Sequence, residues 1–587
     1  MGVFPLLVHL LVKSGCVEMM SDKSQNSREK AWFETKQLTP QKRSLAKKAL
    51  QRIRAGEKVF DAIRRHPLPD GGGFLGKSTL VEVYRQLVSD GEWKSDPSLL
   101  SKIRLKPMRT LSGVTTVTVL TKPYPCPGQC IFCPNDIKMP KSYLPDEPGA
   151  MRALYHDYDP YEQVKARIET LYAVGHPTDK IELLILGGTW SSYPKHYQEW
   201  FIKRCFEAMN RDQTSTDGEP PQGDGKQGGS KAVPPPISLD EGEVSVDLQQ
   251  LQHKNETAAH KNVGLVIETR PDQVTLQELT WLRYLGVTKI QLGVQSMDDR
   301  ILRMNKRGHT VEESINAVAL LRAAGFKIVL HWMPNLLGAS IESDKGDFAL
   351  LWPLLAPDEI KIYPTQLLAG TELYDHWESG SYQPYSTEQL IHLIADLKPG
   401  IPRYCRVNRV IRDIPSTHII EGNKRTSLRQ DVHRELKRRQ QKCKCVRCRE
   451  VRGTAVDTDS LSMMRLVYQV GGTEEYFVSW DTPDDRLAGF IRLSLPGPSS
   501  PDTGMEDLRD AAIIREVHVY GQSLKVGESK DGAAQHSGLG TELIDQAEAI
   551  AAENGFRRIA VIAAVGTRRY YLDRGYRRGE FYLIKDL

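Results

Sequence analysis

Short runs of Ile, Val and Leu recur along the middle of the chain, with segments of helical periodicity between them. The predicted strands are 114–120, 181–186, 263–267, 289–294, 327–332 and 359–363, and examples of predicted helices are 161–174 and 311–324. Each strand run reads as continuous in apolar residues, which is typical of strands buried on both faces. Strands alternating with helices favour right-handed βαβ units in a parallel sheet. The pattern therefore predicts an α/β fold, a partial (β/α)6 barrel over 114–400 with its active site at the C-terminal strand ends.

The hydrophobic pattern changes near residue 454. Strands are predicted at 476–479, 489–495, 513–520, 558–563 and 580–584, and a strong helix at 540–554. We interpret 454–587 as a separate α+β domain.

One segment interrupts the barrel pattern. Between residues 211 and 240, 10 of 30 residues are Gly or Pro, and few are apolar. Such a stretch cannot bury enough surface to offset its ordering entropy, so a low-complexity insertion is expected at 211–260.

Length and composition narrow the class of protein. At about 100–200 residues per domain, 587 residues suggest three to four folded units. Apolar residues at 40% and charged residues at 26% exclude collagen-like, wholly disordered and membrane-spanning chains. The apolar leader, residues 1–20, is too short to span a membrane and lacks the features of a secretory signal. We interpret it as a start annotated too far upstream, with Met19 or Met20 as the true start, and we expect a cytoplasmic protein without a membrane partner.

The net charge of the chain is only +5, but the basic residues are concentrated in two regions. Residues 21–70 hold 13 Lys and Arg against 6 Asp and Glu, and residues 401–450 hold 15 against 5. Clustered basic charge is the electrostatic footprint of a polyanion site, although one such patch can also be a solvated face. Two patches around a predicted catalytic core favour RNA or DNA as a partner. We therefore separate a basic helical N-terminal region, 21–113, from a basic Cys-rich linker, 401–453.

Six of the nine cysteines form two groups, which favours metal binding in a reducing compartment over a disulfide framework. Cys126, Cys130 and Cys133 have the spacing C-x3-C-x2-C, six residues after the first predicted strand. Three thiolates on one loop can hold three irons of a 4Fe-4S cluster, and a zinc loop missing one ligand is the alternative. The spacing, Phe132 and the position in the barrel resemble the radical S-adenosylmethionine superfamily. The resemblance implies that the fourth iron binds S-adenosylmethionine, whose reductive cleavage yields a 5′-deoxyadenosyl radical.

Two glycine turns add to this resemblance. Gly187 and Gly188 directly follow the second strand, where glycine lets the backbone approach a ligand. The superfamily uses a comparable pair for the methionine amine. Gln535, Gly538 and Gly540 form a Gln-x-x-Gly-x-Gly turn that opens the last strong helix and suits a pyrophosphate. The strand–turn–helix order resembles the acetyl-coenzyme A fold of GCN5-related acetyltransferases, in which a tyrosine of the C-terminal helix commonly meets the thioester sulfur.

The two folds in one chain resemble the family of the Elongator catalytic subunit, which modifies the wobble uridine of tRNA. The resemblance covers about 73–587 apart from the insertion. The similar segments are Lys106–Thr110, Glu147–Arg152, Glu268–Asp272, Gln291–Ser296, Arg412–Pro415, Arg515–Gly521 and Val565–Thr567. The compact cysteine spacing is similar to that of prokaryotic members that act without other subunits.

The resemblance implies a mechanism and a set of site residues. The deoxyadenosyl radical abstracts a methyl hydrogen from acetyl-coenzyme A, the carbon radical adds to C5 of the wobble uridine, and thioester hydrolysis leaves a 5-carboxymethyl group. Lys180 and Tyr571 are the implied catalytic residues, and Lys180 is also an implied acetyl-coenzyme A contact. The further implied coenzyme contacts are Glu516, Val517, His518, Val519, Gln535, Gly538, Leu539, Gly540, Thr541 and Tyr571. The basic regions would bind the tRNA, and a reductant of unknown identity is required.

Cys443, Cys445 and Cys448 lie within six residues of one another in the linker. A closed structural zinc site needs four ligands, and Cys405, His418 and His433 are the candidates for the fourth. A redox role is the alternative.

The resulting hypothesis is a tRNA uridine(34) 5-carboxymethyltransferase. A protein lysine acetyltransferase with a purely structural iron–sulfur cluster is the rival, and an RNA-binding scaffold without turnover is a third possibility. The C-x3-C-x2-C motif favours the first, because a structural site would not need an open iron.

Overall fold

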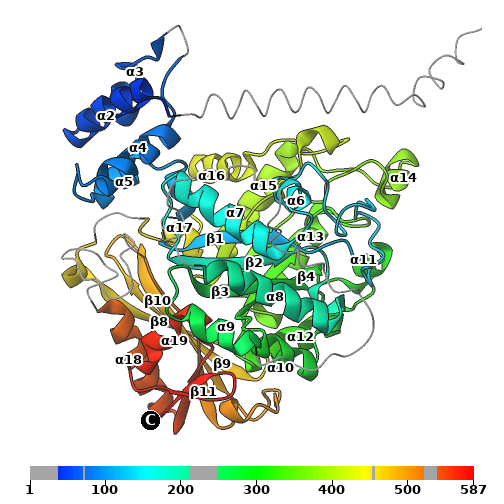
Figure 1. The fold of residues 1–587 in the computed structure, drawn as a ribbon. Helices are drawn as coiled ribbons and strands as arrows, with labels where there is room; N and C mark the ends of the chain where they lie inside the picture. Colours follow the sequence, from blue (N-terminus) through cyan, green and yellow to red (C-terminus); the bar gives the residue numbers. More distant parts are fainter. Residues whose placement is uncertain (1–37, 70–72, 111, 212–246, 453–455, 521–537) are drawn as a thin grey trace, which may run out of the picture. The chain divides into compact units, whose positions relative to one another are not determined.

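The computed structural model describes residues 38–69, 73–110, 112–211, 247–452, 456–520 and 538–587 (Figure 1). The chain divides into two compact units, of which the first is Met1–Met108 with Thr170–His176 and the second is the remainder. Gln535, Cys16 and the apolar leader lie outside the described residues. None of the helices in the described ranges has the length and apolar character needed to cross a membrane.

The first unit is helical, as its sequence predicts. Its helices are α2 (Pro40–Arg54), α3 (Val59–Arg64), α4 (Lys77–Ser89) and α5 (Pro97–Ile103). Thr39 caps α2 by accepting a hydrogen bond from the Lys42 amide, and Pro40 occupies the first turn, where its missing N–H costs nothing. Leu50 and Ile53 of α2 pack with Leu80 and Tyr84 of α4 in one apolar core.

The first sheet of the second unit has seven parallel strands in sequence order, β1 to β7. The strands are β1 (Thr115–Leu120), β2 (Lys180–Leu186), β3 (Lys261–Thr269), β4 (Lys289–Gln295), β5 (Lys327–Trp332), β6 (Glu359–Ile362) and β7 (Arg406–Arg409). The first six confirm the predicted barrel. β7 was not predicted, and it places the start of the region assigned to the linker, 401–453, inside the barrel sheet. Four residues, two of them arginines, give no strand pattern by themselves.

Helices cover the outer face of this sheet (Figure 1). The helices of this part of the chain are α6 (Pro148–Tyr155), α7 (Pro160–Ala173), α8 (Lys195–Met209), α10 (Leu276–Tyr284), α11 (Asp299–Met304), α12 (Val311–Ala323), α13 (Ile341–Leu354), α14 (Glu372–Glu378), α15 (Thr387–Leu397), α16 (Leu428–Arg438) and α17 (Val446–Arg449), of which α14 packs at the cysteine-loop end and α16 packs on α15. A reciprocal capping box of Thr310 and Glu313 begins α12, whose predicted bounds were 311–324.

β4 and β5 are buried at every position after their first residue and β6 is buried throughout, as the sequence predicts, whereas burial alternates along β1 and β2. In β2, Ile181, Leu183 and Ile185 are buried, whereas the residues between them keep some exposure. Polar residues such as Glu182 lie on the inner face and apolar residues on the helix-covered face. The runs KIQLGV, KIVLHW and EIKIY alternate in the same way, so their period of two was present in the sequence and was missed.

The helix α9 (Asp247–Asn255) lies inside the range expected to be a low-complexity insertion, 211–260. Asn255 donates to the Asn210 side chain over 2.8 Å and accepts from the Asn262 amide over 2.7 Å. Residues 247–260 therefore belong to the barrel, because these hydrogen bonds join the end of α8 to the start of β3.

The second sheet has the order β13-β14-β12-β11-β10-β9-β8. Its elements are β8 (Ser462–Val470), β9 (Thr473–Asp481), β10 (Leu487–Pro496), β11 (Ala511–Val519), α18 (Leu539–Glu553), β12 (Arg558–Val561), α19 (Arg568–Leu572), β13 (Arg577–Arg578) and β14 (Leu583–Asp586). α18 packs on the sheet through Leu543, Ala547 and Ile550. We call residues 456–587 the C-terminal domain. The unpredicted β8 is an edge strand with mostly exposed positions, which hides its period.

The C-terminal domain covers the N-terminal ends of the barrel strands. The Asp358 carboxylate, just before β6, accepts two hydrogen bonds from Arg515 of β11. The Nη1 bond is 2.8 Å long and the Nη2 bond is 2.7 Å long. Lys327, at the start of β5, contacts Glu516 of β11. Gly566 approaches β3 so closely that an added Cβ would lie 2.6 Å from the Cβ of Lys261. The N-terminal ends of the barrel strands, which lie opposite to the predicted active site, therefore contact the C-terminal domain.

Candidate functional site

The loop after β1 carries Cys126, Cys130 and Cys133, all partly buried, at the C-terminal end of the barrel. Arg307 donates from Nη1 to the Cys130 sulfur over 3.0 Å. The Cys126 sulfur lies 3.4 Å from the Thr189 hydroxyl, directly after Gly187 and Gly188. The structure therefore brings the cysteine loop and the glycine turn together.

Positive charge surrounds these sulfurs. Burial, and then the Cys130 sulfur, raise the pKa of Cys133 to about 12, while Arg412 and Lys141 act in the opposite direction. The Arg270 Nη1 atom is buried without a hydrogen-bond partner among the described residues, and it would lie 2.3 Å from a Cβ at Gly128, inside the cysteine loop. Three thiols on one loop beside a cationic donor without a partner fit an anionic thiolate-bound iron–sulfur cluster.

The glycine turn needs glycine at its first position. Gly187 has φ +131°, and a Cβ there would lie 2.0 Å from the Thr121 hydroxyl. Gly188 has φ +99°. These values are costly for other residues, so the turn leaves the backbone exposed to a ligand at the C-terminal end of β2.

A cluster of polar residues lies on the inner face near the same end of the barrel, and the sequence reading missed it. His331 of β5 lies 3.0 Å from the Gln291 Oε1 atom and 3.4 Å from Glu268. Lys361 donates to the same Gln291 oxygen. Burial raises the pKa of Glu268, and burial together with Lys361 lowers that of His331. The alternation of polar and apolar residues in β4, β5 and β6 was the signal that could have revealed this cluster.

The predicted coenzyme strand is the second half of β11. Its ladder with β12 ends at Ile514, whereas its ladder with β10 continues to Val519. Burial acts to raise the pKa of Glu516, but Lys327 and Arg492 outweigh it and hold that pKa at about 2. The His518 Nε2 atom is buried without a hydrogen-bond partner among the described residues. Val517, between them, packs against the apolar core of the domain.

The predicted coenzyme turn precedes α18. Gly538 caps the helix with φ +83°, and Leu539 is buried. The Thr541 hydroxyl accepts from Arg574 over 3.1 Å, and a Cβ at Gly540 would lie 3.1 Å from the Tyr570 hydroxyl. The helix start thus offers a close backbone approach beside a guanidinium, which suits a phosphate.

The two predicted catalytic residues lie on different elements. Tyr571 of α19 is buried against Tyr570 and Tyr576, and burial raises its pKa. Lys180 begins β2, where burial lowers its pKa, and its ladder partner is Lys261. Lys180 therefore lies at the barrel end that faces the C-terminal domain, whereas Gly187 and the cysteines lie at the other end.

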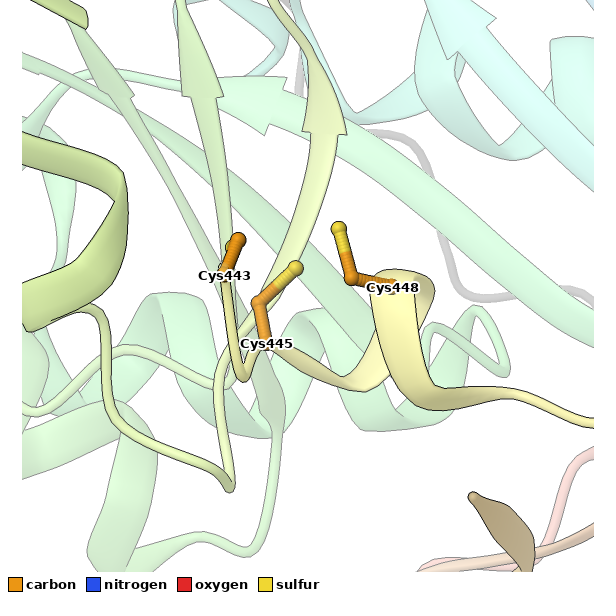
Figure 2. Close-up of side chains that lie close together, drawn as sticks. All are labelled: Cys443, Cys445 and Cys448. Atoms are coloured by element: carbon orange, nitrogen blue, oxygen red, sulfur yellow. The ribbon is translucent and has the colours of Figure 1, made fainter. Parts of the chain in front are cut away.

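Figure 2 shows Cys443, Cys445 and Cys448 turned toward one another, and their sulfurs lie within 4.8 Å of each other. Of the candidate fourth ligands, His418 is hydrogen-bonded to Asp146 over 2.6 Å. The Cys405 carbonyl accepts from the Val446 amide over 3.0 Å, beside Cys445. Cys405 and His433 both interact electrostatically with Cys445, but among the described residues neither joins the three sulfurs that lie within 4.8 Å of one another.

Comparisons with known proteins agree with this geometry. Residues 124–345 match the Radical SAM superfamily, and residues 357–438 match the Radical_SAM C-terminal domain. The tRNA uridine(34) acetyltransferase of Dehalococcoides mccartyi strain CBDB1 is 40% identical over 82% of this chain and 99% of its own length. The Elongator complex protein 3 of Bos taurus is 34% identical over 83% of this chain and 87% of its own length.

A solved structure gives the same result at the level of the fold. The archaeal Elp3 of Methanocaldococcus infernus, with an N-terminal deletion, is 35% identical, with a TM-score of 0.65 over 81% of this chain and all of its own. Membership of the Radical SAM superfamily implies a 4Fe-4S cluster and S-adenosylmethionine. The chain belongs to the radical S-adenosylmethionine family that contains the tRNA uridine(34) acetyltransferases and Elongator complex protein 3.

Proposed function

We propose that this protein forms 5-carboxymethyluridine at the wobble position of tRNA from acetyl-coenzyme A. The observation that carries the proposal is the placement of two sites on one folded unit, the cysteine loop at one end of the barrel and the C-terminal domain at the other. The relatives named tRNA uridine(34) acetyltransferase point to the substrate, the uridine at position 34 of tRNA.

Cys126, Cys130 and Cys133 would hold three irons of the cluster, and the turn at Gly187 and Gly188 would receive the methionine amine. When bound, the cluster and S-adenosylmethionine would supply 5′-deoxyadenosyl radical chemistry, for which the acetyl methyl group would be the hydrogen donor. Arg307 keeps a hydrogen-bond donor and a positive charge beside the Cys130 sulfur.

Acetyl-coenzyme A would bind along β11 beyond Ile514. Extended amide groups can pair with a strand edge there, as in β-strand addition. The helix start at Gly538–Thr541 would hold the pyrophosphate, and Tyr571 would orient the thioester sulfur. Lys180, from the barrel, would complete the site.

The three cysteines of Figure 2 would hold a structural zinc ion, with Cys405 or His433 as the candidate fourth ligand. Thiolates at this separation can share one zinc ion. The basic regions would bind tRNA, an external reductant would supply the electron, and the resemblance to prokaryotic relatives favours action without further subunits.

The direct test is mass spectrometry of tRNA nucleosides after anaerobic incubation with S-adenosylmethionine, acetyl-coenzyme A and reductant. We expect 5-carboxymethyluridine with the wild-type protein and none with Cys130→Ala, which removes the only protein ligand of one iron. Cys205 is buried away from the cysteine loop, and Cys205→Ala is the matched control. This variant should still form 5-carboxymethyluridine. A wild-type protein with a full cluster and no modified uridine would contradict the proposal.

Protein lysine acetylation is the rival activity, and Tyr571→Phe separates it from the proposed one. This change keeps the ring packed against Tyr576 and removes only the hydroxyl. We expect acetyl-coenzyme A hydrolysis and uridine carboxymethylation to fall together, while tRNA affinity stays near wild type. Rapid acetylation of histone-like peptides without S-adenosylmethionine or tRNA would favour the rival.

A further inference from the structure

The guanidinium of Arg307 connects the barrel sheet to the cysteine loop. Arg307 lies between α11 and α12 and is 6% exposed. Its Nη1 atom donates to the Cys130 sulfur over 3.0 Å, and its Nη2 atom donates to the Gly293 carbonyl of β4 over 2.5 Å. Its bonds thus go to a sulfur and a carbonyl, and within the described ranges no carboxylate is paired with its positive charge.

Two neighbours fix the position of this guanidinium. Gly293 leaves room for it, because a Cβ there would lie 3.2 Å from Arg307 Nη2, closer than an ordinary contact. Arg270, directly after β3, donates from Nη2 to the Arg307 carbonyl over 2.6 Å, and its own charge is paired with Asp272 over 2.8 Å. The barrel strands, and not the cysteine loop, therefore hold Arg307 against Cys130.

The positive charge of Arg307 acts in surroundings from which most water is excluded. His309, two residues further along, is 5% exposed. Burial, and then the charges of Arg307 and Arg270, lower the pKa of His309 from 6.5 to about 3. A buried charge acts at a lower effective dielectric constant than a charge in water. The same guanidinium would therefore stabilise a negative charge added to the cysteine loop.

Reduction of an iron–sulfur cluster adds such a charge. An external one-electron donor is oxidised, the cluster is reduced by one electron, and no covalent bond forms or breaks. The added electron makes the ligand sulfurs more negative, so nearby positive charge and hydrogen bonds to these sulfurs stabilise the reduced form more than the oxidised form. The Arg307 Nη1 group, 3.0 Å from the Cys130 sulfur, supplies both effects.

We infer that Arg307 raises the reduction potential of the cluster, so that a weaker external reductant is sufficient to reduce it. The inference rests on the proposed function only in placing the cluster on Cys126, Cys130 and Cys133, and it holds for any product of the radical reaction. Arg307 acts through the Cys130 sulfur and is therefore a positioning residue. Arg270 supports it by holding its backbone.

A redox titration of the anaerobically reconstituted protein, followed by the paramagnetic resonance signal of the reduced cluster, tests the inference. Arg307→Met removes the charge and the donor but keeps a long side chain. At the wild-type midpoint potential, its ratio of reduced to oxidised cluster should fall about tenfold, which is about 59 mV for a one-electron couple. Arg307→Lys keeps a charge and a donor and should recover most of this ratio. Arg303→Met, at an exposed position of α11, is the matched control and should titrate as wild type.

A second measurement needs no loss of the side chain. Wild-type protein grown with ¹⁵N-labelled arginine should show a weak ¹⁵N coupling to the reduced cluster in pulsed paramagnetic resonance spectra. The coupling should disappear in Arg307→Lys, which puts an unlabelled donor at this position. A wild-type spectrum without the coupling, or a coupling that persists in Arg307→Lys, would overturn the inference even if Arg307→Met bound no cluster.

The two proposals fail differently, because the titration contains no tRNA, acetyl-coenzyme A or S-adenosylmethionine. An Arg307→Met protein with the iron content and the midpoint potential of wild type would overturn this inference and leave the proposed function intact. A wild-type protein that titrates as expected and modifies no uridine would contradict only the proposed function. A wild-type protein that binds no 4Fe-4S cluster on the three cysteines would contradict both.

Discussion

His518 shows how one residue depends on its surroundings. Its ring lies 4.3 Å from the Tyr520 ring and 5.9 Å from the Phe490 ring. Burial lowers its pKa from an ordinary 6.5 to about 4; Glu516 acts to raise the pKa, and Lys327 acts to lower it further. The histidine is therefore neutral at physiological pH, a state in which it can accept a proton or a hydrogen bond from a ligand.

This pKa predicts a pH dependence of stability. The unfolded chain binds the proton more tightly than the folded chain between about pH 6.5 and about pH 4, so the stability present above pH 6.5 is lost as the pH falls. At about 1.4 kcal/mol per pH unit, the loss is on the order of 3 kcal/mol. Urea unfolding at several pH values should show a smaller acid loss for His518→Gln than for wild type. His253→Gln, at a side chain that is 69% exposed, is the control. An equal acid loss in all three proteins would contradict the assignment.

The helix α16 illustrates the scale of the element. Leu428, Val432 and Leu436 recur at a spacing of four and are buried, so the opposite face points to solvent. That face carries the basic residues predicted to bind tRNA, but the structure adds carboxylate partners. Arg438 pairs with Glu435 over 2.7 Å, and Arg434 pairs with Asp431. Because some of these arginines are paired with carboxylates, the positive electrostatic field of this face is weaker than its number of basic residues alone would give.

We expect Lys437→Glu combined with Arg438→Glu to weaken tRNA binding and to flatten its dependence on salt. Fewer counterions are released when fewer phosphates are contacted, so the slope of log affinity against log salt should fall by about one per lost contact. Titrations at several salt concentrations measure this slope. Arg509→Glu combined with Arg577→Glu, on the C-terminal domain, should leave it unchanged. An unchanged slope in the α16 variant would show that this face is only solvated.

The whole molecule depends on buried charges between its two sheets. Asp358 and Arg515 are fully buried, and Arg515 also lies 2.8 Å from Glu475. Arg492 joins the same group through a 3.4 Å contact with Asp358. Each charge has lost its water and depends on its partners, so the domains are held in one arrangement at a high desolvation cost.

Removing one of these charges should be costly. Asp358→Asn leaves Arg515 and Arg492 with less negative charge, and such a change typically costs about 3–5 kcal/mol. Calorimetry should show a lower unfolding temperature, with earlier melting of the C-terminal domain. Asp485→Asn, in a half-exposed pair with Arg403, should cost less than about 1 kcal/mol. Equal effects of the two changes would mean that the interface pair contributes no more than a surface pair.

The sequence by itself determined the features that neighbouring residues encode. The apolar run at 327–332 became β5 with the same bounds, and α12 and α18 differ from their predicted ranges by a residue or two. The spacing of Cys126, Cys130 and Cys133 was enough to indicate the family, since one loop holds all three. Local periodicity and close spacing need no knowledge of the rest of the fold.

Only the tertiary structure decided which distant residues meet. The Asp358–Arg515 pair joins residues 157 positions apart, and the Arg307–Cys130 contact joins residues 177 apart. The short strand β7 likewise depended on where the backbone placed it. The physical reason is that burial, desolvation and charge pairing are properties of a three-dimensional neighbourhood, whereas a sequence pattern reports only the residues a few positions away.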